Sequence, residues 1–297
     1  MKPSQITTLI FLSLCLLLAS SIQLLAQDAA DIMFKVDRVE NFSYNSSVRT
    51  IRFSTCQYAV DQGRMHCTDN PRVVIIESVH KDYFTPKKEK DAKSIDVIIS
   101  PIADKGTGML VWKYADQGED SDFWLYLPAL GKVKRIASKN EGSETGSVFG
   151  TEFSIEDATY RKLKDYTYKY LGDDTYNGRP AWMIESIPTD QRAKKTFYSK
   201  VISWIDKERY IILKEDLYDQ NGKQYKQLAT RKVEQIDGIW IVTKTSMNNL
   251  STHRVTNYDT VSIGFNMDID DEFFTQRVLT DFAYREKNMV KYRTYMK

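Results

Sequence analysis

Three tight-turn dipeptides in the second half of the chain constrain its fold most strongly: Asn177-Gly178, Asn221-Gly222 and Asp237-Gly238. Asn, Asp and Gly tolerate the positive φ that the two-residue turn of a β-hairpin requires. The runs between these turns are rich in β-branched and aromatic residues, which favour strands. The expected strands are Tyr166–Leu171, Pro180–Ile187, Lys195–Asp206, Tyr210–Tyr218, Gln224–Ile236, Ile239–Asn248 and Arg254–Asn266. Consecutive hairpins of this kind predict an antiparallel meander.

The first half shows the same alternation of side chains, most clearly between Lys105 and Ile136. One strand in this stretch, Phe123–Leu127, is apolar and aromatic on both faces. A strand of that kind must be covered on both sides. Upstream of it, Val48–Tyr58 and Pro71–Val79 predict a long hairpin, and Ile95–Ser100 predicts a further strand.

Two stretches predict short helices. Apolar residues at helical spacing mark Asp28–Asn41, and a Ser/Asp capping pair opens Ser154–Lys164. Together the patterns predict a mainly β fold with a few helices and about ten to twelve strands, and a sheet this wide tends to curl into a barrel or part-barrel. Because no linker composition divides the chain, we expect a single domain over residues 27–284. A loose basic tail over residues 285–297 is expected to follow.

The N-terminus has the layout of a secretory signal peptide. Lys2 precedes an apolar run over Leu9–Leu18, and small residues follow up to Ala26. We expect residues 1–26 to be the signal, with cleavage after Ser21 as an alternative. An uncleaved membrane anchor is a further alternative, because Ile6–Ala26 is just long enough to span a bilayer.

Removal of the signal leaves two cysteines, Cys56 and Cys67. An even pair in an exported protein favours a disulfide. The turn-like sequence Asp61–Arg64 lies between them and would bring the two cysteines onto adjacent strands. Two free thiols in a half-buried hairpin are the alternative.

The sequence offers no recognisable catalytic, metal or cofactor site. The three histidines, His66, His80 and His253, are widely spaced, and no metal-binding, nucleophile or phosphate-binding motif occurs. The acidic run Asp268–Glu272 lacks the spacing of a calcium loop, so a solvated turn is expected there. The net charge of +2 argues against nucleic acid as a partner. We therefore expect a protein that is not an enzyme and that has no cofactor.

Several segments resemble the LolA-like family of outer membrane lipoprotein-sorting proteins. The resemblance runs from Ala29 to Leu279, and the motifs that carry it are KGTGMLVW at Lys105–Trp112, DFWLYLPALGKVKRI at Asp122–Ile136 and GTEFSIEDA at Gly150–Ala158. It implies an unclosed antiparallel β-barrel with helices packed on its concave side. It also implies a periplasmic carrier that shields the acyl chains of a lipid or lipoprotein during transfer to the outer membrane. A monomer is expected, with an inner-membrane transporter as a further partner.

For such a carrier, aromatic strands are the candidate wall of an acyl-chain site, because each methylene removed from water contributes about 0.8 kcal/mol. The candidate lining residues are Leu110, Trp112, Trp124, Tyr126, Trp182, Trp204 and Trp240. The alternative is that these side chains only fill a large β core. The two predicted helices are candidate lids, with Ala137–Gly146 as a flanking loop. The alternative function is an adaptor of an envelope transporter that binds no lipid.

Overall fold

A computed structural model describes the chain over residues 29–84, 90–116, 119–136, 146–159 and 161–297. The predicted signal peptide lies outside these residues, and so does the predicted loop Ala137–Gly146 except for its last residue.

One antiparallel sheet dominates the described residues. Its strands are β1 (Ser46–Asp61), β2 (Arg64–Cys67), β3 (Arg72–Phe84), β4 (Lys90–Ser100), β5 (Gly108–Lys113), β6 (Asp122–Leu127), β7 (Lys132–Ile136), β8 (Tyr166–Tyr176), β9 (Arg179–Pro188), β10 (Tyr198–Asp206), β11 (Ile212–Asp219), β12 (Gln224–Ile236), β13 (Ile239–Asn249) and β14 (Arg254–Phe265). The order across the sheet is β7-β6-β5-β4-β3-β1-β14-β13-β12-β11-β10-β9-β8, and β2 pairs with β1. The edge strands β7 and β8 lie at opposite ends of this order, so the sheet is not closed.

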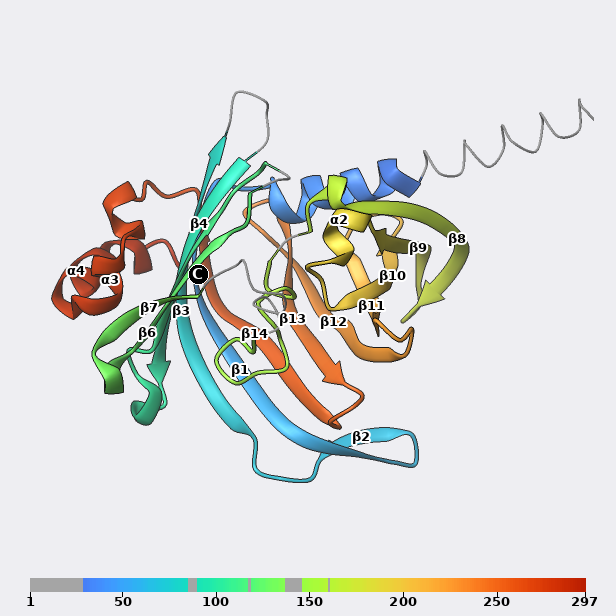
Figure 1. The fold of residues 1–297 in the computed structure, drawn as a ribbon, viewed down its shortest axis with the longest axis horizontal. Helices are drawn as coiled ribbons and strands as arrows, with labels where there is room; N and C mark the ends of the chain where they lie inside the picture. Colours follow the sequence, from blue (N-terminus) through green and yellow to red (C-terminus); the bar gives the residue numbers. More distant parts are fainter. Residues whose placement is uncertain (1–28, 85–89, 117–118, 137–145, 160) are drawn as a thin grey trace, which may run out of the picture.

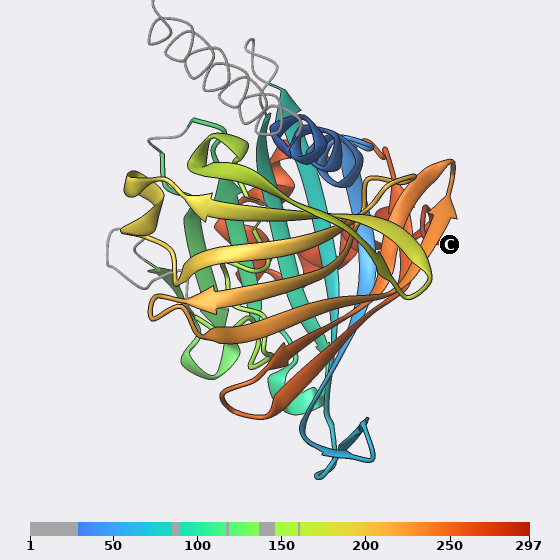
Figure 2. The same cartoon turned by 90° about the vertical axis from the view of Figure 1, so that its right-hand side faces the viewer.

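The sheet bends strongly and encloses a concave side (Figures 1 and 2). The long strand β1 lies at its centre and joins the two halves of the chain: Phe53 is opposite Val74 of β3 and opposite Tyr258 of β14. The expectation of an unclosed antiparallel barrel with helices is confirmed. The described residues form fourteen strands, where the sequence predicted ten to twelve.

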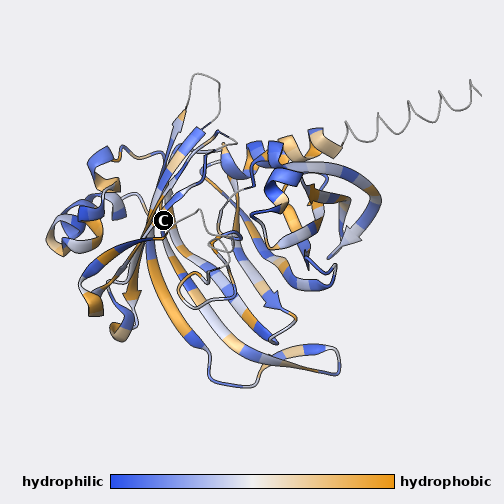
Figure 3. Ribbon diagram, viewed as in Figure 1, coloured by the Kyte–Doolittle hydropathy of each residue, from blue (hydrophilic) through white to orange (hydrophobic). Residues whose placement is uncertain are grey.

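The hairpin turns explain why the second half is so regular. At Asn177-Gly178 and Asp237-Gly238 both residues have positive φ, as the predicted two-residue turns require. At the third turn only Gly222 does. Hydrophilic and hydrophobic residues are interspersed along most of the long strands (Figure 3), and successive side chains point to opposite faces of the sheet.

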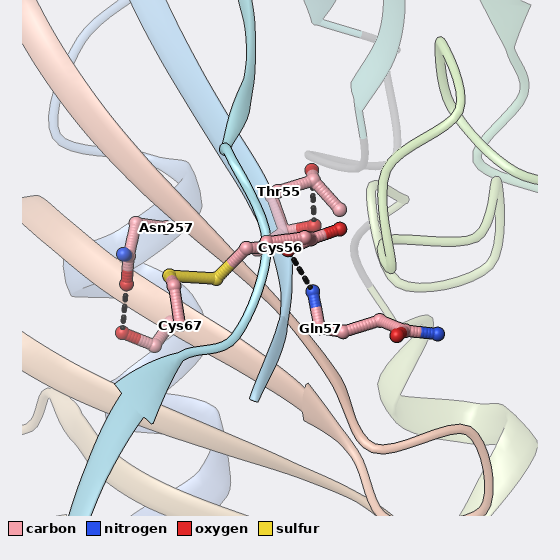
Figure 4. The surroundings of a disulfide bond; sticks show 8 residues. Thr55, Cys56, Gln57, Cys67 and Asn257 are labelled. Atoms are coloured by element: carbon pink, nitrogen blue, oxygen red, sulfur yellow. Dashed lines mark hydrogen bonds between the residues drawn. A yellow bond between two sulfur atoms is a disulfide. The ribbon is translucent and has the colours of Figure 1, made fainter. Parts of the chain in front are cut away.

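The predicted disulfide is confirmed. Cys56 and Cys67 are bonded, with their Cα atoms 5.7 Å apart (Figure 4). β1 runs on to Asp61 and turns directly into β2, so Cys67 is opposite Tyr58 and the bond crosses the pair diagonally. It ties the exposed hairpin tip to the buried part of β1.

The first predicted helix is confirmed over residues 29–41. Its apolar face, with Ala29, Met33 and Val36, packs on the concave side of the sheet against Ile184 and Ile205. The helix thereby covers one rim of the concavity (Figure 1).

The prediction of a second helix over Ser154–Lys164 is wrong. The described residues of this stretch form turns, with a short 3-10 helix over Leu163–Asp165. The expected capping bonds do form: Ser154 N donates to Asp157 Oδ2 at 2.8 Å, and Asp157 N donates to Ser154 Oγ at 3.2 Å. The Asp157 carboxylate also binds side chains of the sheet, so the segment follows the sheet and does not continue as a helix.

The expectation of a loose basic tail after Arg285 is also wrong. Two helices, α3 (Gln276–Thr280) and α4 (Phe282–Arg293), pack on the convex side of the sheet. They lie on the opposite side from the helix at residues 29–41 (Figure 1). Met289 and Tyr292 of α4 are almost fully buried, so this segment contributes to the core although its sequence is rich in charged residues.

This packing predicts that Tyr292→Ala destabilises the protein by about 3–5 kcal/mol, because it leaves a cavity beside Phe273. Urea unfolding followed by fluorescence measures the change. Phe282→Ala, on the same helix but exposed, is the matched control and is expected to change stability by about 1 kcal/mol or less. Equal small effects of both substitutions would show that α4 is not part of the core.

Candidate functional site

The concave side of the sheet is crossed by a non-regular segment, residues 146–159 and 161–165, which we call the inner segment. Its aromatic anchor is Phe153, whose ring centroid lies 6.2 Å from that of Phe53 and 6.4 Å from that of Tyr258. A single bridge between Ser147 and Ser154 closes the loop around this anchor. The inner segment therefore fills the middle of the concavity with its own side chains.

Buried charges hold the inner segment against the second half of the sheet. Asp157 accepts hydrogen bonds from the Tyr198 hydroxyl at 2.7 Å and from Lys226 Nζ at 2.8 Å. The Arg161 guanidinium donates two hydrogen bonds to the Glu215 carboxylate, at 2.5 and 2.7 Å. Loss of one partner of such a buried pair costs about 3–5 kcal/mol, so these contacts fix the path of the segment.

Two cavities remain on either side of the inner segment. The helix-side cavity, of about 390 Å³, lies between the helix at residues 29–41 and strands β11 to β13. The strand-side cavity, of about 420 Å³, lies against β1, β3, β4 and β5. The residues that line both cavities, and so mark their junction, are Asn41, Tyr44, Arg49, Asp157, Ala158, Leu228, Val242 and Thr245. Each volume falls within the range of small-molecule binding sites.

The walls of both cavities combine apolar and charged side chains. Ile51, Phe53, Ile76, Met109, Val148 and Phe153 line the strand-side cavity, and Met33, Val36, Leu163, Ile211, Trp240 and Ile241 line the helix-side cavity. Long apolar groups can pack against these residues, and polar groups at the junction can orient a ligand.

Several ionisable groups facing the cavities are perturbed by burial. Burial raises the pKa of Glu40, in the helix-side cavity, to about 7, although its carboxylate accepts a hydrogen bond from Ile212 N at 3.1 Å. In the strand-side cavity, burial raises the pKa of Asp96 and lowers the pKa of Lys113 and of His80. These shifts reflect removal from water. In the part of the chain that the structure describes, no three His, Cys, Asp or Glu side chains form a group that could hold a metal ion.

Four of the predicted acyl-lining residues, Leu110, Trp112, Trp124 and Tyr126, lie on the convex side and do not line the two cavities. The C-terminal helices and the residues before them cover these side chains. Trp112 Nε1 donates a hydrogen bond to the Phe274 carbonyl at 3.0 Å, and the Trp112 and Trp124 rings pack with centroids 5.1 Å apart. The helices α3 and α4 thus cover one of the two apolar faces of the strand at Phe123–Leu127.

The other three predicted residues occupy different environments. Trp240 lines the helix-side cavity. Trp182 packs with Tyr210 under the helix at residues 29–41. Trp204 is on the convex side, where its Nε1 donates to Asp174 at 2.7 Å and Lys214 lies over its ring. Contact between any of the seven predicted residues and an acyl chain stays a prediction.

Apart from Trp240, the residues that line the cavities were not predicted from the sequence. Alternation along β1 places Arg49, Ile51 and Phe53 on one face, but it does not say which face is concave. Phe153 belongs to the GTEFSIEDA motif, which supports the resemblance to the LolA-like family but does not by itself indicate contact with a cavity. The motif's role as an anchor follows from its contacts with Phe53 and Tyr258.

Comparisons with known proteins agree with this architecture. A family model described as an uncharacterized protein matches residues 90–281. No curated protein matches the chain. Among solved structures, a DUF1329 family protein from Desulfovibrio piger is 25% identical with a TM-score of 0.75, and the match covers 86% of this chain and 99% of that one.

Two further solved structures share the fold. A candidate outer membrane lipoprotein-sorting protein domain from Vibrio parahaemolyticus is 26% identical with a TM-score of 0.72, over 86% of this chain and 99% of that one. A LolA superfamily protein from Nitrosomonas europaea is 17% identical with a TM-score of 0.61, over 83% of this chain and 97% of that one. At that identity the third likeness concerns the fold alone.

The raised pKa of Glu40 predicts a pH-dependent stability. Its pKa rises from 4.5 to about 7 on folding, so the folded state binds the proton more tightly. The stabilising contribution is complete below about pH 4.5 and is lost as the pH rises through 7. Glu40→Gln is expected to remove this dependence. Relative to the unmodified protein, the substitution should be more stabilising at pH 8 than at pH 5 by about 2 kcal/mol. Urea unfolding at both pH values measures the difference, and identical pH profiles of the two proteins would contradict the prediction.

Proposed function

We propose that this chain, which belongs to the LolA-like family of outer membrane lipoprotein-sorting proteins, binds acyl chains within its concave side. The observation that carries the proposal is the pair of ligand-sized cavities on either side of the inner segment, each walled in part by apolar side chains. Burial of an acyl chain there needs no reactive group, because about 0.8 kcal/mol is gained for each methylene removed from water.

The cellular role that fits this binding is transport across the periplasm. The predicted signal peptide over residues 1–26 supports export. Among the described helices, none is long and apolar enough to cross a membrane. We propose that a single domain over residues 27–284 acts as a monomeric, non-enzymatic carrier that takes a lipid or lipoprotein from an inner-membrane transporter to the outer membrane.

The inner segment is the proposed moving part of the carrier. It separates the two cavities, and buried polar contacts together with Phe153 attach it to the sheet. A ligand that occupies the concavity must compete with these contacts or displace the segment, so loading and release are coupled to its position. The helix at residues 29–41 forms the opposite wall of the helix-side cavity and is the second candidate lid.

A bulky side chain at the cavity junction tests the proposal. Ala158 is exposed, and it lines both cavities. Ala158→Trp is expected to weaken binding of the neutral apolar probe N-phenyl-1-naphthylamine about tenfold, because contacts worth about two buried methylenes are lost. Probe fluorescence measures the affinity.

The matched control is Ala283→Trp, which adds the same side chain at an exposed position on α4. It is expected to leave probe binding unchanged. No probe binding by the unmodified protein, together with recovery of a partner protein and no lipid from cell envelopes, would favour the adaptor alternative. Equal weakening by both substitutions would place the binding site away from the concave side.

A further inference from the structure

We infer that the ligand of the concave side is an anionic amphiphile whose headgroup is bound by Arg49. This inference rests on the proposed function, since it assigns a class of ligand to the same cavities. It goes beyond acyl-chain binding because it predicts discrimination between chains of equal length that differ only in the charge of the headgroup.

Arg49 stands where the two cavities meet. It lies in the central strand β1, opposite Ser78 of β3 and Ile263 of β14. Its side chain lines both the helix-side and the strand-side cavity, so it stands at their junction. A headgroup at this point could extend its apolar chain into either cavity.

Tyrosine side chains hold the Arg49 guanidinium. Its Nη2 donates a hydrogen bond to the Tyr44 hydroxyl, and it interacts electrostatically with Tyr258. Within the described part of the chain no carboxylate forms an ion pair with it. The other arginine that lines the helix-side cavity, Arg161, is by contrast bound to a carboxylate through two hydrogen bonds. Neutral phenol groups hold the Arg49 guanidinium without neutralising its charge.

The carboxylates of Asp96 and Asp157 interact with this cation from a distance or are bound to another group. Arg49 favours ionisation of the Asp96 carboxylate. Asp96 lies on β4, two strands from Arg49, and Ser78 of β3 lies between the two residues. Burial raises the pKa of Asp96, and Lys113 acts on the same carboxylate. Asp157, at the junction, is bound to Lys226 at 2.8 Å. An additional anion is therefore electrostatically favoured at the junction.

The chemistry of guanidinium defines the ligand class. A charge removed from water is costly unless it is paired, and a bidentate carboxylate or phosphate is the partner that suits the planar fork of Arg. Apolar side chains lie beside it in both cavities, including Ile51 and Phe53 on the same strand and Ile241 across the cavity. One charged group at the junction and apolar walls on both sides match an acyl chain that ends in a carboxylate or a phosphate.

Displacement of N-phenyl-1-naphthylamine by three ligands with the same twelve-carbon chain tests the inference. The ligands are laurate, dodecyl phosphate and dodecanol, used below their aggregation concentrations. We expect each anion to displace the probe at a concentration about tenfold lower than dodecanol, because a hydrogen bond to a charged group is added. The stronger of the two anions identifies the headgroup as carboxylate or phosphate.

Three variants separate the role of charge from that of packing. Arg49→Met keeps the length of the side chain and is expected to abolish the preference for the anions while leaving dodecanol unchanged. Arg49→Lys keeps the charge and is expected to retain part of the preference. Arg52→Met is the matched control, because Arg52 lies on the same strand but is exposed and does not line either cavity.

Two results would overturn the inference while leaving the proposed function intact. One is equal displacement by dodecanol and the anions in the unmodified protein, which decides the question even if Arg49→Met does not fold. The other is an equal loss of affinity for all three ligands in Arg49→Met, which would give Arg49 a structural role. Failure of the unmodified protein to bind the probe or any of the ligands would overturn the proposed function as well.

Discussion

The attachment of the inner segment to the concave side of the sheet is the constraint on which the site depends. Without it, the bent sheet would hold one continuous hollow. With it, the hollow is divided into two cavities that meet at Ala158 and Arg49. The attachment uses the bidentate Arg161–Glu215 pair and the contacts of Asp157. These contacts place the segment precisely, so a ligand must compete with them to displace it.

The two faces of the sheet are covered by different means, and this difference assigns their roles. On the convex side, α3 and α4 pack over Leu110 and Trp124, and both side chains are buried. On the concave side, the cover is partial, and charged groups such as Arg49 and Glu40 line the remaining space. The buried cluster on the convex side therefore contributes to stability, and the cavities on the concave side leave space for a ligand.

The sequence predicted the local structure well where side-chain alternation and turn residues act over a few residues. The strand Gln224–Ile236 has the predicted bounds, and the helix at residues 29–41 and the disulfide follow from equally local patterns. Prediction from the sequence failed where contacts with residues distant in the chain determine the local structure. The capping pair of Ser154 and Asp157 forms, but Tyr198 and Lys226 draw the carboxylate to the sheet and no helix follows.

Local sequence patterns also could not predict which face of each strand lies on the concave side. The aromatic residues around Trp112 and Trp124 read as the wall of a binding site, because both faces of that hairpin need cover. The cover of one face comes from Phe274 and the helices after it, more than 140 residues later in the chain. Photo-crosslinking with a diazirine-bearing fatty acid, followed by mass-spectrometric mapping, tests whether acyl chains bind within the concave side. Labels are expected on concave residues such as Phe53 and Phe153. Labels confined to the Trp112–Trp124 face or to the C-terminal helices would contradict this binding.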